Sequence, residues 1–282
     1  MSVELADFKT LALRREGGVL HVTLNRPEVR NAMSMAMVRE LRVVLAQAEM
    51  RCGTRDIKHD IEHDIARVIV LRGAGGHFCA GADLSDMAAA RMKLQDDPQA
   101  LAQTNAAFGE LCVAYADTGI AVVAVVEGSC MGGGFGLACV ADVTLATDSA
   151  TFRLPETSLG VVPAQIGPFL VERLGYAEAK RLAVTGGKLN AQDALALRLV
   201  HEVHGADTID SALTRVLSGI LQCAPGAVAA TKALIAKARF QSPAALVQEA
   251  AAVFSRAALG PEGIEGTTAF LQKRKASWVP LA

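Results

Sequence analysis

The chain has 282 residues, and its 51% hydrophobic content is that of a folded globular protein with one substantial core. Its 28 basic and 29 acidic residues nearly cancel, so we expect no general attraction to nucleic acid or to an anionic membrane. The longest apolar run, residues 120–126, is far shorter than the roughly 20 residues that cross a bilayer. No targeting pattern opens the sequence, and we therefore expect a cytoplasmic protein.

Short strands alternate with helical patterns in the first 150 residues. Strands are predicted at residues 19–24, 66–71, 120–126 and 142–146, most of them rich in Val or Ile. A helix is predicted over residues 34–50, with Ser34 as its N-cap and one apolar face formed by Met37, Leu41, Val44, Leu45 and Ala48. This alternation predicts an α/β fold in which helices cover a largely parallel sheet.

Helical patterns alone continue after residue 203. One apolar face contains Leu246, Ala250, Val253, Phe254 and Ala257, and Gly260 followed by Pro261 ends that helix and begins another. We therefore divide the chain into an α/β core, residues 1–204, and a helical region, residues 205–282. The helical region can pack on a second subunit or on its own core.

Metal-binding patterns are weak in this sequence. His59 and His63 stand four residues apart, but the stretch around them carries mixed charges typical of a solvated helix or loop. The six cysteines form no CxxC pair, which is typical of reduced thiols. We expect no metal site.

Two turns rich in small residues follow predicted strands. The segment "HFCAGADLSDM", residues 77–87, comes after the second strand, and "GSCMGGGFGLA", residues 128–138, comes after the third. Ligands gather at the carboxyl ends of parallel strands, where two such turns can aim backbone N–H groups at one oxyanion. Gly133 would add the positive end of a helix. Close packing of helix against sheet explains the glycines equally well, whereas the GxGxxG spacing of a dinucleotide site is absent.

Five segments in order resemble the crotonase superfamily of enoyl-CoA hydratases and isomerases. They are "LNRPEVRNAMS" at 24–34, "FCAGADL" at 78–84, "GSCMGGGFGLACVADVTLAT" at 128–147, "FRLPETSLGVVPA" at 152–164 and "AFLQKRK" at 269–275. The resemblance implies a core of repeated ββα units, a C-terminal helical region that forms trimers or pairs of trimers, and acyl-CoA as the ligand. It implies no cofactor besides the coenzyme A carried by the substrate.

The resemblance also assigns roles to individual positions. The N–H groups of Ala82 and Gly133 correspond to an oxyanion hole for the thioester carbonyl, and Glu156 corresponds to a catalytic acid or base. Positions that contact coenzyme A correspond to Arg26, Arg30, Ala80, Gly81, Asp83, Leu84, Phe270 and Lys273. Positions of the substrate pocket correspond to Gly132, Gly136, Arg153 and Gln165.

The sequence departs from the common hydratase pattern at Gly136, where that pattern has a first glutamate. One carboxylate, Glu156, can still activate water and return the proton. The motifs are most similar to hydratases of 3-branched glutaconyl-CoA thioesters, such as 3-methylglutaconyl-CoA or isohexenylglutaconyl-CoA, from leucine or acyclic terpene catabolism. We expect Gly136 to provide room for the bulky β-substituent.

Several alternatives stay open at this point. Arg153 can pair with a distal substrate carboxylate, lie against Glu156 and lower its pKa, or be an ordinary surface arginine. Gln165 can hydrogen-bond water or substrate, or cap a helix over residues 168–174. The chain can be a hydratase, an isomerase that uses the same glutamate, or an acyl-CoA binder without activity.

Overall fold

The computed structural model describes residues 8–52 and 65–280, so His59 and His63 lie outside the described residues. Its main sheet has six strands in the order β1-β2-β3-β4-β6-β9. These are β1 (Leu11–Glu16), β2 (Val19–Leu24), β3 (Val68–Gly73), β4 (Ala121–Val126), β6 (Val143–Thr147) and β9 (Glu202–His204). The pair β1–β2 is antiparallel, and every other neighbouring pair is parallel.

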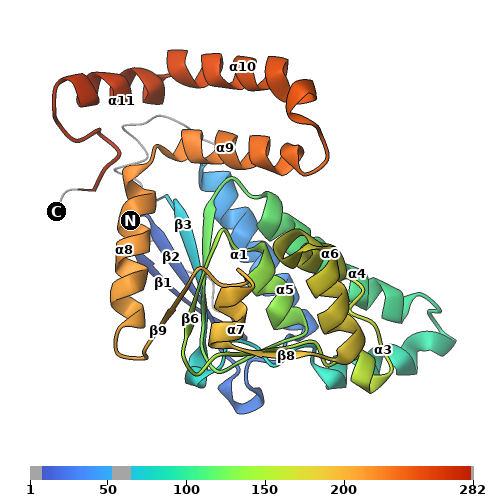
Figure 1. Ribbon diagram of the computed structural model, residues 1–282. Helices are drawn as coiled ribbons and strands as arrows, with labels where there is room; N and C mark the ends of the chain where they lie inside the picture. The colour runs from blue at the N-terminus through green and yellow to red at the C-terminus, as the bar shows by residue number, and fades with distance from the viewer. Residues whose placement is uncertain (1–7, 53–64, 281–282) are drawn as a thin grey trace.

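Both faces of the sheet are buried, as the run of apolar residues in β3 and β4 predicts. Side chains alternate between the faces: Ile69 and Leu71 join the larger core, whereas Val68 and Val70 join a second, smaller core. The larger core is covered by α1 (Met35–Cys52), α4 (Ala100–Asp117), α5 (Gly133–Val140) and α6 (Gly167–Thr185). The smaller core is covered by α8 (Ile209–Gln222), on the other face (Figure 1).

A second sheet of three short strands extends the first. It has the order β5-β7-β8, from β5 (Ser129–Met131), β7 (Thr151–Arg153) and β8 (Lys188–Asn190). The remaining α-helices of the core are α3 (Leu84–Met92) and the short α7 (Ala191–Ala196). Helix α7 begins in a capping box in which Asn190 and Asp193 satisfy each other's backbone N–H groups.

Three helices extend beyond the end of the main sheet (Figure 1). They are α9 (Pro225–Ala238), α10 (Pro243–Leu259) and α11 (Pro261–Leu271), and each begins with a proline at its first helical position. Large apolar side chains lie exposed on them and in the turn between α9 and α10, including Phe240 in that turn, Phe254 on α10 and Phe270 on α11. Trp278, after α11, donates its indole N–H to the carbonyl of Gln222 at the end of α8 (3.0 Å).

The structure confirms the α/β class and the predicted elements in their order. The four predicted strands are β2, β3, β4 and β6, displaced by at most two residues, and the predicted helix is α1. Ser34 accepts a hydrogen bond from the N–H of Met37 (3.2 Å), as expected of an N-cap. The division at residue 204 stays a prediction, since α8 lies on the sheet while α9–α11 lie beyond it. Among the described residues no single helix is long and apolar enough to span a membrane; α8 and α9 meet that description only as a pair bent by 97°.

Candidate active site

The two small-residue turns are joined by backbone hydrogen bonds. The N–H of Cys79 donates to the carbonyl of Ser129 (3.0 Å), and the N–H of Met131 donates back to the carbonyl of Cys79 (2.9 Å). One step further along, a Cβ placed on Gly132 would lie 3.6 Å from the Cα of Gly81. The turns therefore run side by side and touch through their glycines.

Two backbone N–H groups next to this contact have no acceptor among the described residues. They belong to Ala82, which follows Gly81, and to Gly133, the first residue of α5. The flanking amides are satisfied: Gly132 donates to the carbonyl of Arg153 (3.0 Å), and Asp83 donates to that of Met33 (3.0 Å). The N–H of Gly133 has no partner within its own helix because it lies in the first turn, and the N–H of Ala82 lies in the turn before α3 without an acceptor in the described part of the chain. Both groups can therefore donate to a ligand oxygen.

Glu156 lies against the same glycines. It begins a short 3₁₀ turn after β7, and a Cβ placed on Gly132 would lie 2.9 Å from Glu156 Oε1. Its other oxygen, Oε2, is buried and has no hydrogen-bond partner among the described residues. Burial raises the pKa of this carboxyl above its ordinary 4.5. A hydrogen bond from its own backbone opposes this shift without cancelling it. A buried carboxylate oxygen without a partner in the described chain, beside two free amides, can accept a proton from a bound water.

The side of α5 that carries Gly133 and Gly136 packs against apolar side chains. The expectation that Gly136 provides room for a substituent was wrong. A Cβ placed on Gly136 would lie 2.4 Å from Ile166 Cγ2 and 3.5 Å from Phe108 Cζ. Gly136 therefore does not open room for a substrate substituent, because Ile166 already occupies the space that a side chain there would need. Phe108 also contacts Gly133, where a Cβ would lie 3.2 Å from its ring.

Asn31 and His77 hold the first turn, and the sequence analysis did not single out either of them. Asn31 is fully buried with a left-handed backbone, and its Nδ2 donates to the carbonyls of Ala74 (2.9 Å) and His77 (2.7 Å). His77 Nδ1 accepts from the N–H of Ser129 (3.1 Å), which ties the turns together. Asn tolerates positive φ better than most residues, so an Asn ending the polar "RPEVRN" segment was the available signal.

Two of the residues predicted to contact coenzyme A, Arg26 and Asp83, form an ion pair with each other. Arg26 Nη1 donates to Asp83 Oδ2 (2.7 Å) and to the carbonyl of Ala32 (2.7 Å). Asp83 also caps α3 by accepting from the N–H of Ser85 (3.0 Å). The structure thus gives Arg26 and Asp83 the role of fixing the turn that carries Ala82.

The other predicted contacts from this region surround the same turn. The carbonyl of Arg30 accepts from the N–H of Ala80 (2.9 Å), and Gly81 has the positive φ of 98° that brings Ala82 round. Leu84, the first residue of α3, is exposed. Ala80, Gly81 and Leu84 therefore flank Ala82 along the chain, and Arg30 is joined to the same turn by a backbone hydrogen bond.

Arg153 and Gln165 differ in what they contact: Arg153 is exposed, whereas Gln165 is hydrogen-bonded to α4. Arg153 is exposed at the end of β7, and it is absent from the groups that shift the pKa of Glu156. Gln165 donates from Nε2 to Asn105 Oδ1 (2.8 Å) and covers Gly109 of α4. The capping alternative for Gln165 was wrong, because α6 begins at Gly167 without a side-chain cap.

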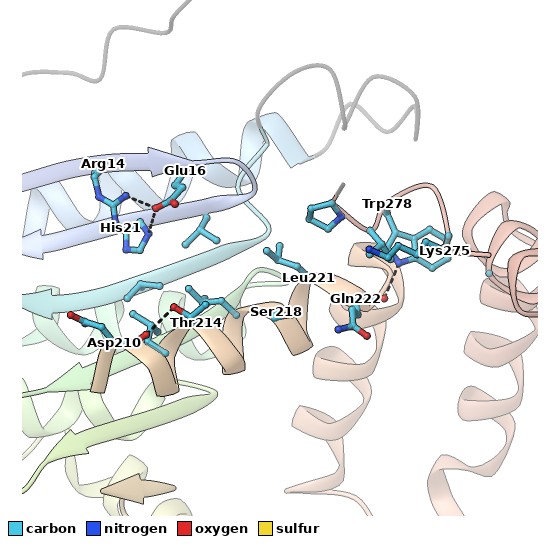
Figure 2. Close-up of a pocket in the computed structure, with 18 of the residues that line it drawn as sticks. Arg14, Glu16, His21, Asp210, Thr214, Ser218, Leu221, Gln222, Lys275 and Trp278 are labelled. Atoms are coloured by element: carbon cyan, nitrogen blue, oxygen red, sulfur yellow. Dashed lines mark hydrogen bonds and ion pairs between the residues drawn. The ribbon is translucent and has the colours of Figure 1, made fainter. Parts of the chain in front are cut away.

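Phe270 and Lys273 do not join the turns within one chain. Phe270 instead lines an open groove of about 1090 Å³ on the sheet face opposite to α5 (Figure 2). We call this cavity the sheet groove; its walls are β1–β3, α8, α11 and the segment after α11 up to Pro280. Its charged side chains include two ion pairs, Arg14 with Glu16 (2.5 Å) and Arg72 with Asp210 (2.6 Å). Ala82, Gly133 and Glu156 do not line the sheet groove, so the free amides and the unpartnered carboxylate lie elsewhere.

The fold that carries these two turns and the carboxylate is shared with known proteins that the chain resembles. The family model of the enoyl-CoA hydratase/isomerase family matches residues 14–280, and the chain belongs to that family. A solved structure of Pseudomonas aeruginosa AtuE is 47% identical, with a TM-score of 0.88, over 96% of this chain and 100% of that one. The 2,3-dehydroadipyl-CoA hydratase of Escherichia coli is 30% identical over 94% of this chain and 96% of its own. A peroxisomal Δ(3,5)-Δ(2,4)-dienoyl-CoA isomerase of Arabidopsis thaliana is 28% identical over 98% of this chain and 99% of its own.

Proposed function

We propose that the protein is a hydratase that adds water across the double bond of a 3-branched glutaconyl-CoA thioester. The observation that carries the proposal is the buried, unpartnered Oε2 of Glu156 beside the free N–H groups of Ala82 and Gly133. The thioester carbonyl oxygen accepts from both amides, which leaves Glu156 next to the carbons that react. Membership of the hydratase/isomerase family supports the acyl-CoA substrate.

The reaction balances with one carboxylate. Glu156 takes a proton from water while the oxygen of that water bonds to the β-carbon, and the electrons of the double bond move toward the thioester oxygen. The two amides stabilise the resulting enolate, where one such donor is worth roughly 2.7 to 4 kcal/mol in an acyl-transfer enzyme. The protonated Glu156 then gives its proton to the α-carbon. The raised pKa of Glu156 suits both the removal and the return of this proton.

The 3-branched glutaconyl substrate is proposed from the motif resemblance, of which the glycine at position 136 is one part. A glutaconyl ester carries a distal carboxylate, and Arg153 is an exposed cation that makes no ion pair with the described residues. We propose that it pairs with that carboxylate. The space for the branch must come from outside Gly136, since Ile166 fills the position beside it.

We further propose that coenzyme A lies along the rim formed by Arg30, Ala80, Gly81 and Leu84, and that the protein is a trimer or a dimer of trimers. The side chains that a second copy would cover are the exposed Phe240, between α9 and α10, and Phe254, Leu259 and Leu271 on α10 and α11. Phe270 and Lys273 of one copy would then reach the coenzyme A of another.

A panel of enoyl-CoA esters in water labelled with heavy oxygen tests the function. We expect fastest turnover with 3-methylglutaconyl-CoA or isohexenylglutaconyl-CoA, and a product that carries the label. A 3-enoyl ester whose double bond shifts without label would instead identify an isomerase, which the same carboxylate can serve. Binding of the esters without turnover would identify an inactive acyl-CoA binder.

A further inference from the structure

We propose that Phe108 and Ile166 form the apolar wall of the acyl site and that Ile166 sets how large a substituent on the β-carbon the site accepts. This inference rests on the proposed function, because it assumes a thioester held at Ala82 and Gly133. It adds a specificity-determining residue, Ile166, that belongs to none of the sequence motifs quoted above.

The wall is defined by contacts with α5. The Phe108 ring lies against Gly133, where a Cβ would be 3.2 Å from Cζ, and Ile166 Cγ2 lies against Gly136, where a Cβ would be 2.4 Å away. Gly133 and Gly136 are three residues apart, so they share one side of the helix. Phe108 and Ile166 therefore continue one apolar surface away from the free N–H of Gly133.

The carboxylate stands on the other side of the same glycine run. Glu156 Oε1 lies 2.9 Å from the Cβ position of Gly132, so the site has a polar side at Gly132 and an apolar side at Gly133 and Gly136. A thioester whose oxygen binds Gly133 N–H has its α- and β-carbons between these two sides. Its reacting carbons then face Glu156, and a β-substituent faces the wall.

Ile166 is held firmly in this position. A residue that limits the size of the β-substituent must not move aside when the substrate binds. Its side chain is 3% exposed and belongs to the larger core, and its carbonyl accepts from the N–H of Leu170 (2.9 Å) at the start of α6. A β-branched side chain has few favourable rotamers, and close packing in the core disfavours turning Cγ2 away from Gly136. Phe108 is partly buried and packs on the same core, with its ring against Gly133.

Dissociation constants of two saturated esters, butanoyl-CoA and 3-methylbutanoyl-CoA, test the wall without any turnover. We expect Ile166→Ala to improve the binding of the 3-methyl ester relative to butanoyl-CoA by about tenfold, the scale at which a pocket senses one methylene group. Ile166→Leu removes Cγ2 at nearly constant volume and is expected to shift the ratio in the same direction, so the test survives if the alanine variant does not fold.

Two matched variants separate this wall from general loosening of the protein. Ile166→Val keeps Cγ2, and Leu170→Ala cuts a buried side chain one turn further along α6, so both are expected to leave the ratio within about twofold. An unchanged ratio in both Ile166→Ala and Ile166→Leu, or an equal shift in Leu170→Ala, would overturn the proposal. Failure of the proposed function is distinguishable, because it would show as absent water addition by the wild-type protein while the binding ratio still shifts.

Discussion

The site around Glu156 and the sheet groove differ in whether their polar groups have partners. The sheet groove is wide, yet its arginines and acids contact one another, as Arg14 contacts Glu16 and Arg72 contacts Asp210. The site around Glu156 instead holds a buried carboxylate oxygen and two amides without partners in the described residues. Because an unsatisfied buried polar group costs free energy, it is better evidence for function than the volume of a hollow.

The substitution of Glu156 is expected to have the largest effect and tests this comparison most severely. Glu156→Gln keeps the shape but removes the base, so we expect water addition to fall by about 10² to 10⁴-fold. Binding of a saturated acyl-CoA ester should be nearly unchanged, as measured by titration calorimetry. A variant that hydrates at the wild-type rate would exclude Glu156 as the base.

The next effect concerns the support of the first turn. Asn31→Ala leaves the carbonyls of Ala74 and His77 without a donor, so the free energy of unfolding should fall by about 3 kcal/mol. Chemical denaturation measures this loss, and water addition should fall with it because the turn positions Ala82. Asn105→Ala is the control: its side chain is exposed and contacts Gln165, so we expect a change within about 0.5 kcal/mol. Equal losses in both variants would contradict the role given to Asn31.

A smaller effect is expected in the pH dependence. The base must be ionised, so kcat/KM should decline as the pH falls through the raised pKa of Glu156, with a midpoint above 4.5. The same shift weakens the native state once the pH rises through that pKa, whereas below the unfolded-state pKa the penalty is absent. Glu156→Gln should therefore melt at a higher temperature than the wild type at neutral pH, with the difference closing in acid. A midpoint below 4.5 would show that another group stabilises the carboxylate.

The smallest effect is expected in the sheet groove. Glu16→Gln removes the partner of Arg14 but touches neither turn, so the rate of water addition should stay within about twofold of the wild type. The same enzyme assay as for Glu156→Gln provides the comparison. A large loss would mean that the sheet groove takes part in the reaction.

The sequence predicted those parts of the fold that repeat over several residues. The buried runs of β3 and β4 and the apolar face of α1 have clear periodicity, and the structure confirms them. Strand β1 was missed because its polar residues, Arg14, Arg15 and Glu16, conceal an edge strand. Strands β5, β7 and β8 have three residues each, too few to show a period.

The candidate site was predictable where it depends on backbone and unpredictable where it depends on side-chain packing. Strand ends followed by small residues located both turns, and the structure joins them near Glu156. The filling of the space at Gly136 by Ile166 depends on how α5 and α6 pack, which single-sequence patterns do not contain. The pairing of Arg26 with Asp83, 57 residues apart, is likewise a tertiary contact.

A crystal structure of Glu156→Gln with a bound enoyl-CoA ester tests the central claim most directly. We expect the thioester carbonyl oxygen within hydrogen-bonding distance, about 2.7 to 3.2 Å, of both the Ala82 and the Gly133 nitrogens. The β-carbon should face the substituted side chain. A carbonyl oxygen out of reach of either nitrogen, or an acyl group seated in the sheet groove, would contradict the account.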